Sequence, residues 1–405
     1  MKHIVIFLNT HLRSGIFRNS FHSSHLPVRF ICLLFSLVLI SPFSVSQTRE
    51  FIYVGTFSGD LEKGIYVYAF DRKNGSLSPV QTLGGMESPT YIEIHPNGRF
   101  LYSVNRNSIN EEKDWGSVSS YSIDPSTGKL THINDQPSFG NAPCHMSLDS
   151  QGRILFIANY GSGSIAAYPV GKDGSLAKAS KVIQHTGSSV GGERQKGPHA
   201  HCAVVSPKDD FLYVADLGTD RIKTYRINYY EKSMDPVLGA DGIADPGSGP
   251  RHITISADQR FLYLLEEMGH KVAVFSIDPM NGALIPVQTL STLPEDYKET
   301  NFCADIRIDP SGKFLYATNR GHNSLAIYEI DQKSGTLSLV DIQSVEGDWP
   351  RNFLIDPRGD FLFVANRRTN NVLVFRRNVS SGKLTYTQVE VSLPEPVCIK
   401  FLEVK

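Results

Sequence analysis

Phe261-Leu-Tyr-Leu, at 261–264, belongs to a short motif that recurs seven times in this chain. Successive copies start about fifty residues apart, which is the spacing of a structural repeat. Each copy is an aromatic and aliphatic run of the kind that forms a buried strand. The copies are Phe51-Ile-Tyr-Val, Phe100-Leu-Tyr-Ser, Ile154-Leu-Phe-Ile, Phe211-Leu-Tyr-Val, Phe261-Leu-Tyr-Leu, Phe314-Leu-Tyr-Ala and Phe361-Leu-Phe-Val.

Strand patterns also flank each copy of the motif. A strand and a tight turn containing Pro and Gly precede most copies, as in Ile94-His-Pro-Asn-Gly. An alternating strand such as Ile65-Tyr-Val-Tyr follows, and a second turn then leads to a fourth strand. No segment shows a sustained helical period. Four antiparallel strands repeated at this spacing predict an all-β protein made of propeller blades.

The two ends of the repeat predict how the ring of blades closes. The copy at Phe51 lacks the preceding strand, whereas the C-terminal Pro396-Val-Cys-Ile-Lys-Phe has no copy after it. A blade shared between the termini would remove two open sheet edges. We therefore expect a seven-bladed β-propeller of four-stranded antiparallel blades, in a single domain over 50–405. The longer insert at 228–248 is expected to be a surface loop.

The first 46 residues resemble a targeting segment. An apolar run over Phe30–Val45 follows Arg29 and ends among small residues, which favours a secretory signal cleaved near Ser46. An uncleaved anchor and a start codon assigned too early are the alternatives. We expect an exported, periplasmic protein with no stable membrane anchor after cleavage, or a cytoplasmic one if the segment is not a signal.

Composition narrows the classes of function. Lys+Arg total 40 and Asp+Glu 41, so the formal net charge of -1 argues against general nucleic-acid binding. Four cysteines lie beyond the signal segment, and their wide spacing predicts neither a zinc site nor a disulfide framework. These cysteines are Cys144, Cys202, Cys303 and Cys398.

Polar residues recur where the innermost strand of each blade begins. Aligning the blades on the motif places there Thr90, Cys144, His201, Arg251, Ala304 and Arg351, followed by Tyr91, His145, Cys202, His252, Asp305 and Asn352. Antiparallel pairing brings these positions to the same rim as the ends of the second strands. Those ends carry Asn105-Arg106, Asn159-Tyr160, Asp216-Leu217, Glu266-Glu267, Asn319-Arg320 and Asn366-Arg367. We expect substrate-binding residues to be His145, His252, Arg351, Asn319 and Asp305.

Some of these residues have simpler interpretations. The repeated Asn is typical of a residue that caps a loop, whereas Glu267 and Arg320 break the repeat with charges. His199 and His201 have a spacing compatible with a metal ion, but no carboxylate is near in sequence, so we expect neither metal nor cofactor. Gly187-Ser-Ser-Val-Gly matches the sequence pattern of a nucleophile elbow, but no strand is expected before it and no helix after it. We therefore do not expect Ser189 to be a nucleophile.

Seven motifs occur in order along the chain, namely Tyr53-Val-Gly-Thr, Gly197-Pro-His-Ala-His-Cys, Gly249-Pro-Arg-His, Phe261-Leu-Tyr with Glu267, Ala304-Asp-Ile-Arg, Asn319-Arg-Gly-His and Pro350-Arg-Asn-Phe. Taken together they resemble the 6-phosphogluconolactonase family of seven-bladed propellers, which includes a carboxy-muconate lactonising enzyme. The resemblance covers nearly the whole chain from Phe51. It implies a catalytic site formed by Glu267, Arg251, Arg320 and one of two histidines, His199 or His201.

The resemblance implies hydrolysis of a sugar lactone, and the residues fit that chemistry. Glu267 and a histidine can activate water, while arginines hold an anionic group and stabilise developing negative charge. Glu266 occupies a position where relatives commonly have Asn, so we expect a second carboxylate to perturb Glu267. A lactonising or cycloisomerising enzyme and a non-catalytic periplasmic binding propeller are the alternatives. Export would conflict with 6-phosphogluconolactone as substrate, since that lactone forms in the cytosol.

Overall fold

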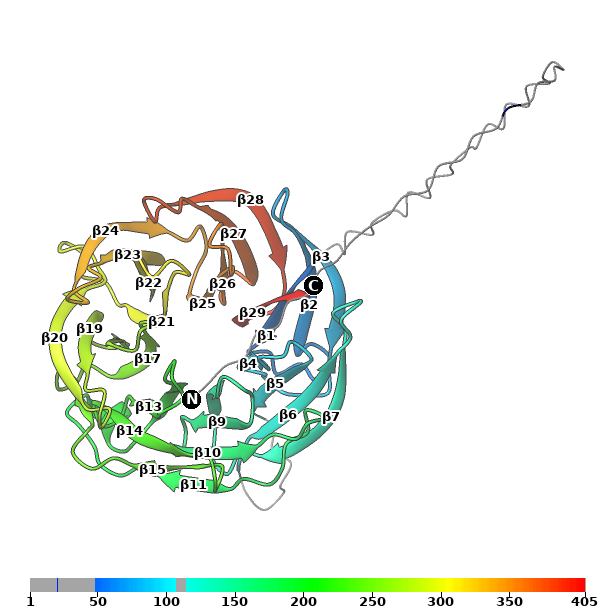
Figure 1. Ribbon diagram of the computed structural model, residues 1–405. Helices are drawn as coiled ribbons and strands as arrows, with labels where there is room; N and C mark the ends of the chain where they lie inside the picture. The colour runs from blue at the N-terminus through cyan, green and yellow to red at the C-terminus, as the bar shows by residue number, and fades with distance from the viewer. Residues whose placement is uncertain (1–19, 21–47, 107–113, 405) are drawn as a thin grey trace. The chain divides into compact units, whose positions relative to one another are not determined.

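The described residues from 48 onward form seven β-sheets arranged in a ring (Figure 1). The computed structural model describes residue 20 and residues 48–106 and 114–404. The signal segment expected at 1–46 lies outside the described residues, apart from residue 20. Among the described residues, the only helix is the short 3₁₀ helix η1 (Gly192–Gln195). The prediction of an all-β, seven-bladed propeller is therefore confirmed.

Every blade contains four antiparallel strands counted outward from the central channel. The innermost strands are β4 (Tyr91–Ile94), β8 (Pro143–Leu148), β12 (Ala200–Val205), β17 (Pro250–Ile255), β21 (Phe302–Ile308), β25 (Pro350–Ile355) and β29 (Pro396–Val404). The recurring motif forms the second strands, β1 (Arg49–Thr56), β5 (Phe100–Asn105), β9 (Ile154–Asn159), β13 (Phe211–Asp216), β18 (Phe261–Glu266), β22 (Phe314–Arg320) and β26 (Phe361–Asn366). The third strands are β2 (Ile65–Asp71), β6 (Ser117–Ile123), β10 (Ser164–Pro169), β14 (Arg221–Asn228), β19 (Lys271–Ile277), β23 (Ser324–Ile330) and β27 (Asn371–Arg377). The outer strands are β3 (Ser76–Leu83), β7 (Leu130–Pro137), β11 (Lys181–Gln184), β15 (Ser233–Pro236), β20 (Leu284–Ser291), β24 (Leu337–Ser344) and β28 (Leu384–Ser392).

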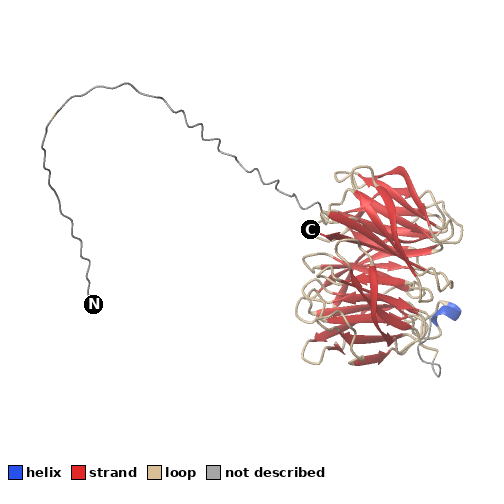
Figure 2. Ribbon diagram, turned by 90° about the vertical axis from the view of Figure 1, so that its right-hand side faces the viewer, coloured by secondary structure: helices blue, strands red, loops and turns tan. Residues whose placement is uncertain are grey.

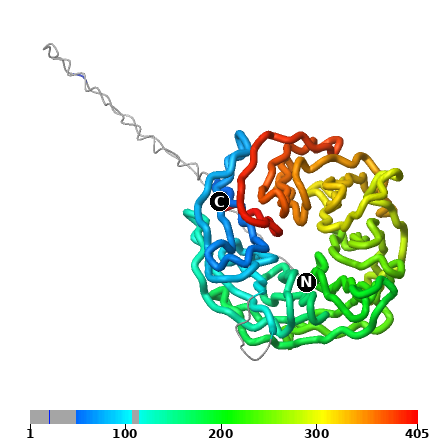
Figure 3. The backbone as a smooth tube through the Cα atoms, turned by 180° about the vertical axis from the view of Figure 1, so that it is seen from behind, coloured from blue at the N-terminus to red at the C-terminus, as the bar shows by residue number. Residues whose placement is uncertain are grey.

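The ring closes through a blade that both ends of the chain build. Strand β29 pairs antiparallel with β1, with Arg49 opposite Val404 and Gly55 opposite Cys398. The sheet order is β29-β1-β2-β3, which agrees with the predicted shared blade. Figures 1 and 3 show the red C-terminal strand beside the blue first strand, viewed from opposite sides.

Contacts between neighbouring blades explain why the motif begins with Phe. The ring of Phe51 packs on Gly128, which lies in the outer turn of the next blade with φ of +74°. A Cβ on Gly128 would come within 2.5 Å of that ring, so the turn needs both a positive φ and no side chain. Tyr53 adds an interblade hydrogen bond by donating its hydroxyl to the Gly128 carbonyl at 2.8 Å. The same packing recurs at Phe361 and Gly75, which joins the last blade to the shared one.

The insert at 228–248 differs from the expected surface loop. It contains β15 and a further short strand, β16 (Gly242–Ile243), and both pair with β14. The insert therefore supplies the outer strand of its blade. The adjoining copy of the motif begins with Ile154 rather than Phe, since its neighbour lacks the usual glycine turn.

The innermost strands give the channel two chemically distinct ends. They lie side by side around the channel, so their first residues meet at one end and their last residues at the other. Figure 2 shows η1 on one face of the ring, whereas the C-terminus lies on the opposite face. The candidate active site lies at the end where the innermost strands begin.

Candidate active site

A β-bulge at the start of the innermost strands sets the direction of the key side chains. In β17, Pro250 pairs with Glu266 and His252 with Leu265, which leaves Arg251 unpaired between them. The same irregularity leaves Cys144, His201 and Arg351 unpaired in their own blades. Because a bulge redirects the extra side chain, these residues turn toward the near end of the channel.

The near end contains a cavity of about 190 Å³, which we call the arginine mouth. Its wall combines bulge residues with residues at the ends of the second strands and in nearby loops. The lining residues are Phe57, Arg106, Cys144, Tyr160, Arg194, His201, Glu267, Arg320 and Arg351.

Three guanidinium groups surround the single carboxylate of this cavity. Arg194 Nη2 lies 2.8 Å from Glu267 Oε1, while Arg251 Nε and Arg320 Nη2 lie 2.8 Å and 3.1 Å from Oε2. Arg251 is buried beneath the cavity and also donates to the Ala304 carbonyl. The structure thus brings together the predicted Glu267, Arg251 and Arg320.

These contacts determine the ionisation of Glu267. Burial raises the pKa of its carboxyl, but Arg320, Arg251 and Arg194 outweigh burial and lower the pKa to about 2. Glu266, which was expected to perturb Glu267, is not among the main causes of this shift. Glu266 itself has buried carboxylate oxygens without a hydrogen-bond partner among the described residues.

Arg351 is a further guanidinium near Glu267. It lines the cavity beside Phe57, with its guanidinium carbon 5.6 Å from the ring centroid. Among the described residues it forms no ion pair. Burial together with Arg251 and Arg320 lowers its pKa well below the usual value, and the charge of Glu267 opposes this shift. The cavity therefore has an excess of cationic donors, which favours an anionic ligand.

His201, rather than His199, lines the arginine mouth. Its ring lies edge-on to Tyr160 with centroids 5.3 Å apart, and burial followed by the charge of Arg251 lowers its pKa well below the usual value. His199 stacks on Tyr160 at 4.6 Å and donates through Nδ1 to the Tyr160 carbonyl at 2.8 Å. The sequence left open which of the two histidines faces the site, and the position of His201 in the cavity wall favours His201.

Arg194 and Phe57 were missed because neither belongs to the repeated positions. Arg194 lies on η1, and the neighbouring Gln195 anchors that helix by donating to the Leu217 carbonyl and to Asp220, both at 2.7 Å. The loop that precedes β12 is longer than its counterparts, but nothing in its letters indicates that it reaches Glu267. Phe57 follows β1, at a position that the blade alignment did not include.

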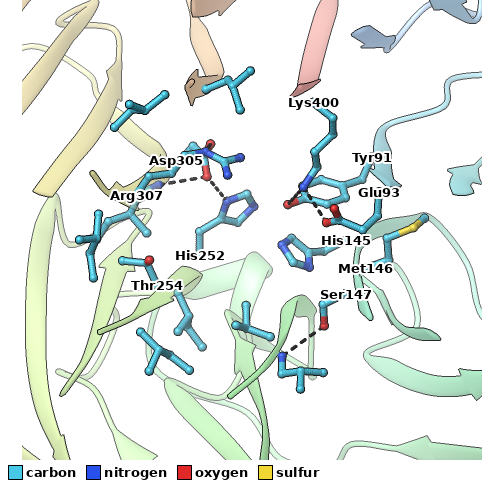
Figure 4. Close-up of a pocket in the computed structure, with 18 of the residues that line it drawn as sticks. Tyr91, Glu93, His145, Met146, Ser147, His252, Thr254, Asp305, Arg307 and Lys400 are labelled. Atoms are coloured by element: carbon cyan, nitrogen blue, oxygen red, sulfur yellow. Dashed lines mark hydrogen bonds and ion pairs between the residues drawn. The ribbon is translucent and has the colours of Figure 1, made fainter. Parts of the chain in front are cut away.

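Four predicted substrate-binding residues do not reach the arginine mouth. Asn319 is buried in a network, accepting from Thr292 Oγ1 at 2.8 Å and donating to the Thr292 carbonyl at 2.8 Å. His145, His252 and Asp305 line a separate cavity farther along the channel (Figure 4). These four residues therefore do not share the expected rim, although the ring of His252 lies only 5.4 Å from that of His201, which lines the arginine mouth.

No cluster of three His, Cys, Asp or Glu side chains suited to a metal ion occurs among residues 48–106 and 114–404. Over the same ranges, no helix is long and apolar enough to cross a membrane. The four cysteines expected to form no disulfide framework are buried and free.

The fold and the site together define a seven-bladed propeller with a cationic pocket at one end of its channel. Residues 51–401 match the family model described as "Lactonase, 7-bladed beta-propeller", so the chain belongs to the lactonase family of seven-bladed β-propellers. It is 36% identical to 6-phosphogluconolactonase of Bacillus subtilis over 88% of this chain and 99% of that protein. The structure of the periplasmic gluconolactonase of Pseudomonas aeruginosa has a TM-score of 0.82 and 35% identity, covering 88% of this chain and 100% of that one.

Proposed function

We propose that the protein hydrolyses an anionic sugar lactone to its open-chain acid at the arginine mouth. The family and the lactonase relatives support lactone hydrolysis as the reaction. The preference for an anion is supported by one observation: among the described residues Arg351 forms no ion pair, while Glu267, the carboxylate nearest to it, is already shared by three other arginines.

The arginines would act at two points of the reaction. A phosphate or carboxylate of the substrate would neutralise Arg351, which forms no ion pair among the described residues. Attack of water on the lactone carbonyl moves negative charge onto the carbonyl oxygen, and a guanidinium directed at that oxygen stabilises the charge as it develops. Glu267 would hold Arg194, Arg251 and Arg320 in place for these tasks.

His201 is the better candidate for the general base. A carboxylate with a pKa of about 2 accepts a proton poorly near neutral pH, which weakens the expected role of Glu267 as base. His201 is neutral, and the charge of Arg251 and Arg351 contributes to its low pKa. An anionic substrate that neutralises these arginines would raise the pKa of His201, and so would increase its basicity only when the site is filled.

The proton balance is simple. His201 takes a proton from the attacking water, the ring C–O bond breaks, and the departing alkoxide receives the proton. One water is consumed, and the product is a hydroxy acid.

A lactone panel tests the proposal directly. The purified protein is assayed with phosphorylated, carboxylated and uncharged lactones, with and without a chelator. We expect hydrolysis, with the highest kcat/KM for an anionic lactone. Binding without turnover of any lactone would instead support a ligand-binding propeller, and formation of a lactone from an unsaturated acid would support the lactonising alternative.

We also propose that the protein is exported after cleavage near Ser46. The apolar run over Phe30–Val45 supports export, and the Pseudomonas aeruginosa relative is a periplasmic protein by name. Mass spectrometry of protein from the native host should find a terminus near Gln47. Intact Met1 in the soluble cytoplasmic fraction would reverse this proposal and would favour a cytosolic lactone.

A further inference from the structure

The far end of the channel contains a second, larger cavity, of about 410 Å³. Residues of the innermost strands beyond the bulge form its wall, and strand alternation directs every second side chain inward. We call this cavity the ion-pair mouth. Its polar lining consists of Tyr91, Glu93, His145, Ser147, His252, Thr254, Asp305, Arg307 and Lys400 (Figure 4).

The charges of this cavity are paired within the protein. Lys400 Nζ lies 2.6 Å from Glu93 Oε2, and Arg307 Nε lies 3.1 Å from Asp305 Oδ2. Despite burial, Asp305 and Glu93 raise the pKa values of Arg307 and Lys400 respectively, so both cations stay charged. The carboxylates match the cations in number, which leaves no excess charge to attract an ion.

The two histidines of the cavity add no charge. Burial is the main cause that lowers the pKa of His145 well below its usual value and that of His252 to about 4. His252 donates through Nδ1 to Asp305 at 2.9 Å, so its Nε2 is an acceptor. No partner for that nitrogen occurs among the described residues.

Hydrogen-bonding capacity of both kinds remains available in the cavity. The Arg307 side chain donates through Nε to Asp305 and to the Phe353 carbonyl, and its two terminal nitrogens have no partner among the described residues. The Thr254 hydroxyl can both donate and accept a hydrogen bond, and it too has no hydrogen-bond partner among the described residues. Aliphatic residues complete the wall, among them Val204, Val205, Ile255, Ile308, Leu354 and Ile355.

We propose that the ion-pair mouth is a binding site for a small uncharged polyhydroxylated molecule, such as a sugar. Hydroxyl groups can accept from Arg307 and Lys400 while donating to His252 Nε2, and C–H faces can pack on the aliphatic wall. A phosphate or carboxylate would instead meet Glu93 and Asp305, and would lose its own hydration without a net attractive charge. The two cavities share no lining residue, although the rings of His201 and His252 lie 5.4 Å apart between them, and the proposal does not rest on lactone hydrolysis.

Ligand-observed NMR tests this site with D-glucose as the neutral probe and inorganic phosphate as the anionic probe. Thr254→Val removes one hydroxyl with little change of shape. The double substitution Glu93→Gln with Lys400→Met removes the ion pair without leaving either charge unpaired. Arg351→Met in the arginine mouth is the matched control, and thermal unfolding of each variant verifies that it is folded.

We expect saturable glucose binding by the parent and by Arg351→Met, and affinity lower by about tenfold in each ion-pair-mouth variant. Absence of glucose binding by the parent would overturn the proposal. So would glucose binding that Arg351→Met abolishes while Thr254→Val and the double variant retain it. Phosphate binding that only the double variant loses would show that the cavity selects an anion instead.

Discussion

The two ends of the channel differ in charge although the same strands build both. At the arginine mouth, Glu267 is shared by three arginines, and Arg351 forms no ion pair among the described residues. At the ion-pair mouth, each cation has its own carboxylate. Arg251 and His252 are consecutive residues, yet one contacts Glu267 and the other Asp305. A one-residue bulge is thus enough to give one strand two chemically distinct ends.

Removal of residues 394–405 should have the largest effect, because it affects both ends. The deletion takes away β29, which pairs with β1 along its whole length and supplies Lys400 to the ion-pair mouth. We expect insoluble or molten protein, since an inner strand and its core face are lost. Solubility and near-ultraviolet circular dichroism measure the outcome. Unchanged thermal unfolding and activity after the deletion would refute the shared-blade account.

Replacement of His201 should give the largest loss of rate in a folded protein. His201→Gln removes the proposed base and should reduce kcat by about 10²–10⁴-fold. His199→Gln is the matched control, because His199 lies behind Tyr160 and does not line the cavity. It should have a much smaller effect. Equal losses in the two variants, measured at saturating lactone, would remove the distinction between the histidines.

Glu266 and Glu267 are adjacent, but the pKa of Glu266 is raised and that of Glu267 is lowered. The dependence of protein stability on pH tests this difference. Burial raises the pKa of Glu266 from 4.5 to about 7. The folded state therefore holds a proton that the unfolded chain releases, so stability should fall as pH rises from about 4.5 to 7 and then level off. Glu266→Gln should remove this loss, which is on the order of 3 kcal/mol.

Urea unfolding of the parent and Glu266→Gln at pH 5 and pH 8 measures this difference. The control is Glu267→Gln, in which the shift at Glu266 should persist. A parent whose Glu266-dependent stability is the same at both pH values would show that this carboxyl is not buried uncharged.

The propeller was predictable because the same packing of a Phe ring on a glycine turn recurs between most neighbouring blades. Phe51 and Phe361 each need a glycine turn in the next blade, so the sequence repeats both partners at a fixed spacing. Strand β29 was predictable for a related reason, since a blade without an inner strand leaves an edge unpaired. The short strands in the insert at 228–248 were not predictable, because they do not follow the repeat.

The site was only partly predictable. Charged residues at or just after the ends of the second strands led to Glu267 and Arg320, and the structure places both at the cavity. Register counting could not detect the bulge, because pairing two residues against one leaves no signature in the letters. His252 and Asp305 were therefore grouped with the arginine mouth, whereas both line the ion-pair mouth. The role of Arg194 could not be predicted from the sequence, since its position depends on how Gln195 anchors η1 to distant loops.

The most direct test of the central claim is the selectivity of Arg351→Met. Arg368→Met is the matched control, because Arg368 is exposed, belongs to the same blade and stacks on Trp349 outside the cavity. The measurement is the ratio of kcat/KM for a phosphorylated lactone to that for its uncharged counterpart. We predict that Arg351→Met lowers this ratio by roughly 10- to 100-fold, mainly through KM, and that Arg368→Met preserves it. An unchanged ratio in Arg351→Met would contradict the account of the arginine mouth as the site that selects an anionic lactone.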